Sequence, residues 1–90
     1  MLQRSQWDIM ASVLRVAKSP ESKTHIMYGA NLSFRQLERY LKFLVDRELL
    51  RVSEERRSKV TKLFVTTDSG VSFLETYRRL QEIVREKKRS

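Results

Sequence analysis

The segment from Lys23 to Leu50 constrains the fold most, because it holds two helix patterns separated by a very short turn. A short helix is predicted at about residues 23–29, and Gly29 suits its end, where a left-handed residue is favoured. Ser33 and Gln36 have capping-box spacing and begin a second, amphipathic helix. Two helices joined this closely are typical of a helix-turn-helix, whose second helix can enter a DNA major groove.

A supporting helix is predicted upstream, over residues 5–18, because apolar side chains recur there at spacings of three and four before Pro20 ends the pattern. The same spacing marks one face of the third helix, and in the short second helix Ile26 and Met27 are expected to face the core. The expected core-facing residues are Trp7, Met10, Val13, Leu14 and Ala17 in the first helix, Ile26 and Met27 in the second, and Phe34, Leu37, Tyr40, Leu41, Leu44 and Val45 in the third.

A hairpin is predicted after these helices. Residues 50–53 alternate apolar with polar and form its first strand, residues 54–58 form a charged turn, and residues 60–66 form its second strand. A final helix is predicted from about Thr67 to Lys87. A hairpin in this position is the wing of a winged helix. The predicted fold class is therefore α+β, mainly α: a winged helix-turn-helix of three helices and a β-hairpin, followed by a C-terminal dimerisation helix.

The length of the chain suits one domain. Ninety residues allow one modest core, and an apolar content of 40% argues against disorder. We expect a single winged-helix domain over residues 1–90, with the helix-turn-helix core and wing in residues 1–66 and the C-terminal helix in residues 67–90. Cysteine is absent, and no apolar run approaches the roughly 20 residues that span a bilayer. These features predict a soluble, intracellular protein without a membrane-spanning segment. Together with the DNA binding that the helix-turn-helix pattern indicates, they predict a cytoplasmic, chromosome-associated location and no membrane partner.

The net charge of +8 is the strongest bulk signal, since a compact domain this basic attracts polyanions. The charge is not confined to a tail. Residues 1–53 hold nine Lys and Arg against five Asp and Glu, and residues 54–90 hold ten against six, so each part carries +4. Nucleic acid or an anionic membrane surface is the partner class that this balance indicates.

A family resemblance rests on three stretches: the block KTHIMYGANLS, the run LERYLKFLVDRELL shortly after it, and the pattern T-x-x-G-x-x-FL-E beyond the hairpin. With these stretches the chain, from about Trp7 to Leu80, resembles the small archaeal winged-helix DNA-binding proteins, the ten-kilodalton chromatin-type family of Sulfolobus-like thermoacidophiles. The resemblance implies binding of double-stranded DNA as a homodimer. It also implies that the C-terminal helix pairs with its mate in an antiparallel coiled coil.

The resemblance leaves the biological role open. Related domains occur in archaeal transcription regulators and in archaeal viruses, and one fold serves many functions. The C-terminal helix ends only about ten residues beyond Leu80, which is shorter than expected for the chromatin type. This departure favours a regulator or a virus-encoded version.

The outward face of the third predicted helix carries the groups best suited to DNA. Arg35, Gln36 and Arg39 lie in its N-terminal half, the part of a recognition helix that usually points at base edges. Arginine can pair with guanine and glutamine with adenine, whereas Lys42 suits a phosphate. An ordinary solvated helix face is the alternative interpretation.

Further DNA contacts are expected at helix starts and in the wing. Thr24 and Ser33 lie near the free backbone N–H groups of helix N-termini, which favour phosphate. Arg56, Arg57 and Lys59 in the hairpin turn can reach a minor groove or the backbone, although two neighbouring glutamates weaken the local field. A charged turn that is merely solvated is the alternative here.

The apolar stripe of the C-terminal helix has two expected roles. Phe73 and Leu74 are expected to pack on the first helix of the same chain. Tyr77, Leu80 and Val84 are expected to form a dimer interface with a second copy. Packing of the whole stripe within one chain is the alternative.

An enzyme is not predicted. His25 is the only histidine, and neither a convergent carboxylate pair nor a Gly-rich phosphate loop accompanies it, so no catalytic residue, metal site, cofactor or small-molecule substrate is expected. The sequence predicts a homodimer that binds double-stranded DNA as a transcription regulator or a chromatin-type architectural protein. The alternatives are a winged-helix protein–protein adaptor without direct DNA binding, and an RNA-binding protein, although the paired surface aromatics of common single-strand readers are missing.

Overall fold

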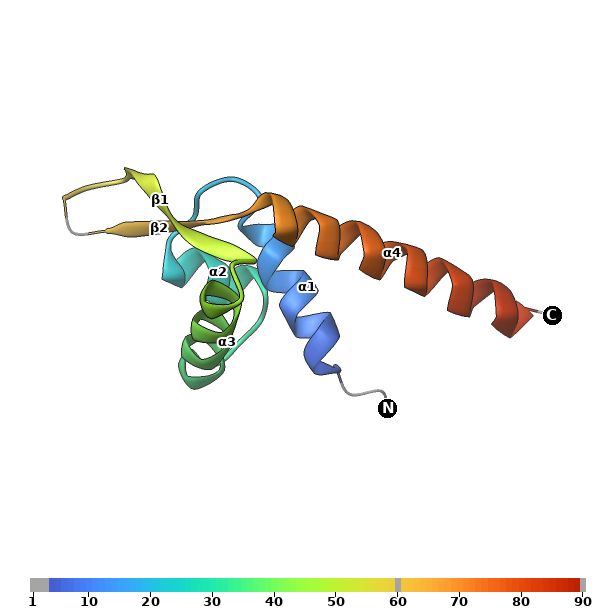
Figure 1. Ribbon diagram of the computed structural model, residues 1–90. Coiled ribbons are helices and arrows are strands. Elements are labelled where there is room, and N and C mark those ends of the chain that lie inside the picture. The colour runs from blue at the N-terminus through green and yellow to red at the C-terminus, as the bar shows by residue number, and fades with distance from the viewer. Residues whose placement is uncertain (1–3, 60, 90) are drawn as a thin grey trace.

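In the part of the chain that the structure describes, four helices and one antiparallel hairpin follow one another in the predicted order. The computed structural model describes residues 4–59 and 61–89. The elements are α1 (Gln6–Val16), α2 (Lys23–Gly29), α3 (Phe34–Asp46), β1 (Leu50–Arg56), β2 (Lys62–Thr66) and α4 (Asp68–Arg89). The three shorter helices and the base of the hairpin form a head, from which the hairpin tip projects on one side and α4 on the other (Figure 1). This is the predicted winged helix-turn-helix arrangement, with a long C-terminal helix.

Serine side chains fix where α2 and α3 begin. Ser33 Oγ accepts a hydrogen bond from the Gln36 N–H at 3.2 Å, and Gln36 Oε1 accepts one from the Ser33 N–H at 3.0 Å. The predicted capping box is therefore confirmed. Ser22 Oγ accepts a hydrogen bond from the His25 N–H at 3.2 Å, so Ser22 caps α2.

The turn between α2 and α3 differs from the prediction at Gly29. This glycine has no left-handed backbone; the residue that does is Asn31, with a φ of 58°. Asparagine tolerates this conformation better than most residues because its short polar side chain bonds locally. Gly29 instead ends α2 at a close approach to α1, where a Cβ on it would lie 2.9 Å from Val16 Cγ2. The glycine is thus explained by helix packing, and the asparagine makes the turn.

The core lies where α1, α2 and α3 meet the hairpin base and the start of α4. Its buried side chains are Ile9, Met10, Ala11, Val13, Leu14, Ala17, Ile26, Ala30, Leu32, Leu37, Leu41, Leu44, Leu50, Phe64 and Leu74. Met27, Tyr40 and Val45 are partly buried against it, as predicted. Two predicted core residues are wrong, since Trp7 is 54% exposed and Phe34 is 64% exposed. Both lie in the first turn of their helix, and the Trp7 ring contacts α4 at Phe73 without being covered by it.

The hairpin has an irregular register, which changes which of its side chains face the head. The shift in pairing falls between Val52 and Arg56. The predicted alternation of burial is wrong here, because Val52 is 41% exposed while Ser53 is buried. β1 also continues to Arg56, through residues predicted to form the turn. Val60, predicted to begin the second strand, lies outside the described residues.

Backbone hydrogen bonds attach the base of the hairpin to the chain that follows α1. Glu21 and Phe64 exchange two of them, at 3.0 and 2.8 Å. The Thr66 N–H donates to the Ala17 carbonyl at 2.8 Å, and Thr66 Oγ1 donates to the Leu14 carbonyl at 2.8 Å. The wing therefore leaves the head from a fixed base.

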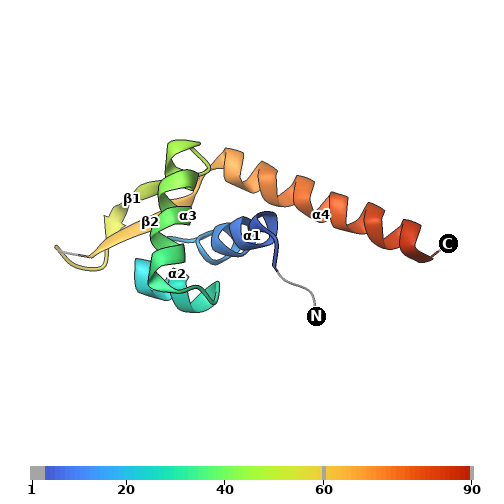
Figure 2. The ribbon, with the colours of Figure 1, turned by 90° about the horizontal axis from the view of Figure 1, so that it is seen from below.

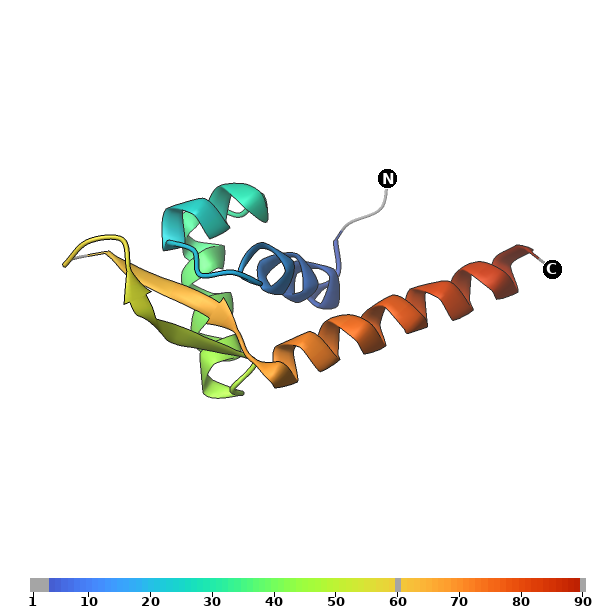
Figure 3. The same ribbon diagram turned by 90° about the horizontal axis from the view of Figure 1, so that it is seen from above.

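The first half of α4 packs on the head, and the second half leaves it (Figure 3). A Cβ on Gly70 would collide with the Leu49 carbonyl oxygen, so α4 starts very close to the chain that enters β1. Leu74 is buried, and the Phe73 ring stacks on Trp7 with 6.4 Å between ring centroids. The predicted packing of Phe73 and Leu74 on the first helix is confirmed.

Candidate nucleic-acid interface

The underside of the head is formed by α3, which crosses in front of the hairpin in Figure 2 and whose first turn is the lowest part of the head in Figure 1. Arg35, Arg39 and Lys42 are exposed on this helix. Their spacings of four and three residues place them on one helix face. α3 therefore presents three cations along the side that points away from the core.

Local contacts orient two of these cations. The Arg39 guanidinium carbon lies 5.5 Å from the centroid of the Tyr40 ring, within the range of a cation–π contact. Lys42 Nζ lies 3.3 Å from Asp46 Oδ2, and both side chains are exposed. A solvent-exposed pair of this kind contributes little, so the lysine can exchange its carboxylate for another anion at small cost.

Gln36 takes part in the cap of α3 and remains partly exposed. The residue is half-buried, and its Oε1 already accepts the Ser33 N–H. An amide oxygen has a second lone pair and the amide nitrogen has two donors, so a contact with a base would add to the cap rather than replace it. Ser33 itself is exposed at the helix start, and Thr24 is exposed in the first turn of α2.

An ion pair that sequence patterns did not predict joins the two helices of the helix-turn-helix. Lys23 Nζ lies 2.9 Å from Glu38 Oε2, linking the start of α2 to the first half of α3. Both side chains are partly exposed, so the pair connects the two helices at the surface and contributes little stability. The two residues belong to different helices, 15 positions apart, so no helical spacing signals their contact.

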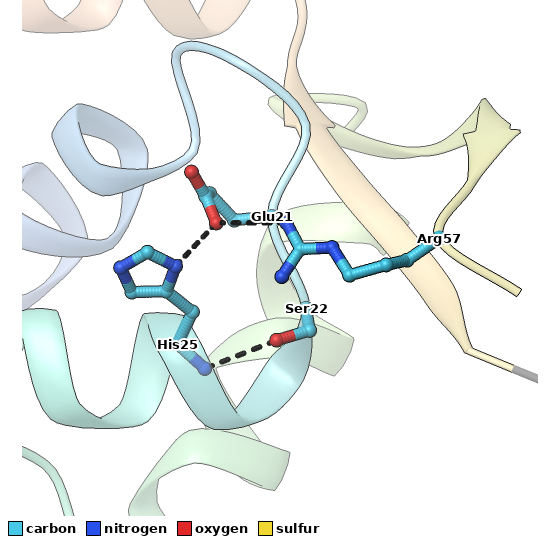
Figure 4. Close-up of polar contacts among 4 residues, drawn as sticks. All are labelled: Glu21, Ser22, His25 and Arg57. Atoms are coloured by element: carbon cyan, nitrogen blue, oxygen red, sulfur yellow. Dashed lines mark hydrogen bonds and ion pairs between the residues drawn. The ribbon is translucent and has the colours of Figure 1, made fainter.

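The wing cations divide into two groups. Arg56 and Lys59 are exposed near the hairpin tip. Arg57 turns back toward the head, where its Nη2 atom lies 3.7 Å from Glu21 Oε1 (Figure 4). The same buried oxygen contacts His25 Nδ1 from α2, a contact that is attractive when the imidazole is protonated. These approaches lack full hydrogen-bond geometry, so Glu21 acts as a shared counter-ion that links the wing to α2.

The distal half of α4 carries an exposed apolar stripe. Leu80 and Val84 are each 57% exposed, and Ile83, which was not among the predicted interface residues, is 49% exposed. Tyr77 differs from them, because it is half-buried and its ring lies 6.3 Å from that of Phe73. Tyr77 therefore lies at the boundary between the packed and unpacked parts of the helix.

The described residues give little support for a metal site or a membrane-spanning helix. Within residues 4–59 and 61–89, no group of three or more His, Cys, Asp or Glu side chains is placed to hold a metal ion. None of the helices in the described part of the chain is long and apolar enough to cross a membrane. A cleft between α1 and α3 is lined by Gln6, Trp7, Met10, Arg39, Tyr40 and Phe43.

Sequence comparison agrees with this fold. The family model for winged helix-turn-helix domains matches residues 3–85. The uncharacterized protein MJ0287 of Methanocaldococcus jannaschii is 31% identical over 85 residues, which cover 93% of this chain and 80% of that protein.

Structural comparison gives neighbours with the same fold. The crystal structure of Sso10a-2, a DNA-binding protein from Sulfolobus solfataricus, has a TM-score of 0.77 at 24% identity and covers 96% of this chain and 90% of that one. A mutant of MepR from S. aureus has a TM-score of 0.76 at 12% identity, over 96% of this chain and 63% of that one. BpsR from Bordetella bronchiseptica has a TM-score of 0.71 at 17% identity, over 88% and 61%. At these identities the similarity describes the fold.

Proposed function

The chain belongs to the winged helix-turn-helix family, and on that premise we propose that it binds double-stranded DNA as a homodimer. It acts either as a transcription regulator or as a chromatin-type architectural protein, in the cytoplasm and on the chromosome. The observation that carries this proposal is the outer face of α3, where Arg35, Arg39 and Lys42 are exposed along a capped helix on the underside of the head. Sso10a-2, which has this fold, is described as a DNA-binding protein.

Docking begins with the charge of the whole chain. A net charge of +8 attracts the phosphate backbone and releases condensed counterions from it, which makes the affinity dependent on salt. α3 then enters the major groove, with Arg35 and Arg39 toward guanine edges and Lys42 toward a phosphate. Gln36 can add a contact with adenine while it keeps its bond to the helix start.

The remaining contacts position the head on the duplex. Thr24 and Ser33 lie at helix starts, where backbone N–H groups and side-chain hydroxyls suit phosphate oxygens. Arg56 and Lys59 extend the cationic surface to the wing. Arg57 contributes only after it leaves Glu21, which makes it the weakest member of the predicted set.

The dimer is supported by the apolar stripe on α4. Leu80, Ile83 and Val84 are about half exposed in one chain and lie next to Tyr77, so a second α4 can cover them in an antiparallel pair. A dimer doubles the DNA contacts and fixes their separation. Two heads on one face of B-DNA contact it about 34 Å apart, or at a multiple of that distance.

Fluorescence anisotropy across a salt series tests the proposal. The double variant Arg35→Ala/Arg39→Ala is expected to bind a DNA duplex at least about 30-fold more weakly, from roughly 1 kcal/mol or more for each arginine. The matched control, Arg15→Ala/Lys18→Ala, removes two exposed cations near the end of α1 and is expected to lose only a few-fold. Equal losses of DNA affinity in the two variants would mean that α3 does not contact the bases.

Binding to two different DNA duplexes distinguishes a transcription regulator from an architectural protein. Equal affinity for a random sequence and for the protein's own promoter region, with a steep salt dependence, supports the architectural role. A salt-resistant preference for the promoter supports a regulator. Absence of binding to either duplex at low salt would overturn DNA binding and favour a protein–protein adaptor, for which the aromatic cleft between α1 and α3 is a suitable docking surface.

A further inference from the structure

Phe34 is an apolar side chain in an unexpected place. It is the first residue of α3 and is 64% exposed, although the other apolar residues of the first two turns of that helix face the core. The start of α3 does not need it for packing. Leu32 and Leu37 occupy the two positions of a hydrophobic staple around the Ser33 cap, and both are buried.

The position of Phe34 directs its ring toward any ligand that contacts the N-terminal end of α3. Side chains on a helix lean toward the N-terminus, so a side chain in the first turn projects past the helix start. The first turn of α3 is also the lowest part of the head (Figure 1). Arg35 follows directly and is exposed as well, so the first turn of α3 exposes an aromatic ring and a guanidinium on neighbouring sides of the helix.

The DNA major groove offers one apolar group to such a ring. Guanine, cytosine and adenine present only hydrogen-bond donors and acceptors there, whereas thymine presents its 5-methyl group. We propose that Phe34 contacts thymine methyl groups in the major groove and makes the protein prefer thymine at that position. This inference rests on the proposed function, because it assigns a specificity to the first turn of the same helix, beside the face of Arg35, Arg39 and Lys42.

The inference separates two kinds of readout on one helix turn. Arg35 reads acceptors on a base edge by hydrogen bonds, and these bonds are unaffected by a methyl group. Phe34 gains only from burying apolar surface, so its contribution disappears when the methyl group is removed and the base pairing is kept. Deoxyuridine differs from thymidine by that methyl group alone and is therefore the appropriate probe.

The experiment compares two duplexes of alternating A·T pairs, one with thymine and one with uracil at every such position. Wild-type affinity is expected to fall about fourfold for each methyl group that Phe34 can no longer cover, or about 15-fold when both heads of a dimer are affected. Phe34→Ala is expected to bind the thymine duplex more weakly and to bind both duplexes equally. Phe43→Ala removes a ring that is 40% exposed near the other end of α3 and is expected to keep the full discrimination.

The outcomes distinguish failure of this inference from failure of DNA binding. Equal wild-type affinity for the two duplexes, with both bound, would overturn the methyl contact and leave the proposed function standing. Discrimination retained by Phe34→Ala would overturn the assignment to this residue. No binding to either duplex would overturn both proposals. The wild-type comparison needs no substitution, and Phe34→Gln, which keeps a helix-compatible side chain, provides a second variant that must also lose the discrimination.

Discussion

The two halves of α4 have the same apolar spacing and opposite surroundings. In the proximal half Gly70 lies against the Leu49 carbonyl, and Leu74 is 8% exposed. In the distal half Leu80 and Val84 are each 57% exposed. A periodic pattern therefore identifies a helix face that will be covered, but it does not say whether the cover comes from the same chain or from another.

Helix length explains the difference. α1 has 11 residues and extends about 16 Å, whereas α4 has 22 residues and extends about 33 Å. Trp7, near the start of α1, stacks on Phe73, so the cover that α1 supplies ends near Tyr77. Beyond Leu80, α4 leaves the head (Figure 3).

The largest expected effect tests the proximal half. Gly70→Ala is expected to lower the free energy of unfolding by about 3 kcal/mol, because the new methyl group meets a backbone carbonyl that cannot move aside. Gly29→Ala is the matched control. Its methyl group meets the Val16 side chain, which can shift, and alanine favours the helix, so the expected change is within about 1 kcal/mol. Urea denaturation measures the free energy of unfolding of both variants, and equal losses in the two would contradict the predicted difference between the glycines.

The next effect tests the distal half. Leu80→Asp is expected to give monomers whose DNA affinity is about 100-fold lower, because the two heads no longer bind as a linked pair. Gln81→Asp introduces the same charge one position along, outside the apolar stripe, and is expected to remain dimeric. Sedimentation velocity and anisotropy measure the two properties. Unchanged sedimentation of the Leu80 variant would show that this stripe is not the dimer interface.

A smaller effect is expected at the boundary between the halves. Trp7→Ala removes the ring that stacks on Phe73 and is expected to lower the unfolding free energy by about 1.5 kcal/mol. Trp7 also lines a small cleft with Ser5, Tyr77 and Leu80, so the variant is expected to weaken the dimer as well. Trp7→Phe keeps an aromatic stack and serves as the control. A loss of dimerisation without any loss of stability would assign Trp7 to the distal region instead.

The smallest effect separates fold stability from association. Val84→Ala is expected to raise the dimer dissociation constant about tenfold, since apolar area is lost in both copies. Extrapolated to the monomer, its unfolding free energy is expected to change by less than about 0.5 kcal/mol. Thermal melts over a range of protein concentrations resolve the two quantities. A melting temperature that is lowered equally at all concentrations would place Val84 in the fold of one chain.

Local patterns predicted the elements of the fold well. Spacing and caps placed all four helices, because a capping box such as that of Ser33 and Gln36 depends on residues three apart. Trp7 and Phe34 were assigned wrongly to the core, since periodicity carries no information on how much of a helix face its neighbours cover. Ser53 was missed as a buried residue because the register shift beside it has no sequence signature.

The candidate site was predicted less completely than the fold. The exposed positions of Arg35, Arg39 and Lys42 follow from the helix face alone. The ion pairs of Lys23 with Glu38 and of Arg57 with Glu21 join residues that are far apart in sequence, and tertiary packing alone brings them together. The second of these pairs changes the expected role of Arg57, which local charge patterns could not indicate.

Native mass spectrometry of the protein mixed with a short DNA duplex tests the central claim most directly. The mass of the complex reports how many chains bind one duplex, under conditions that preserve both protein–protein and protein–DNA contacts. We predict two chains on one duplex, and one chain at most for Leu80→Asp under the same conditions. A wild-type complex with a single chain would contradict the dimer, and absence of any complex would contradict DNA binding.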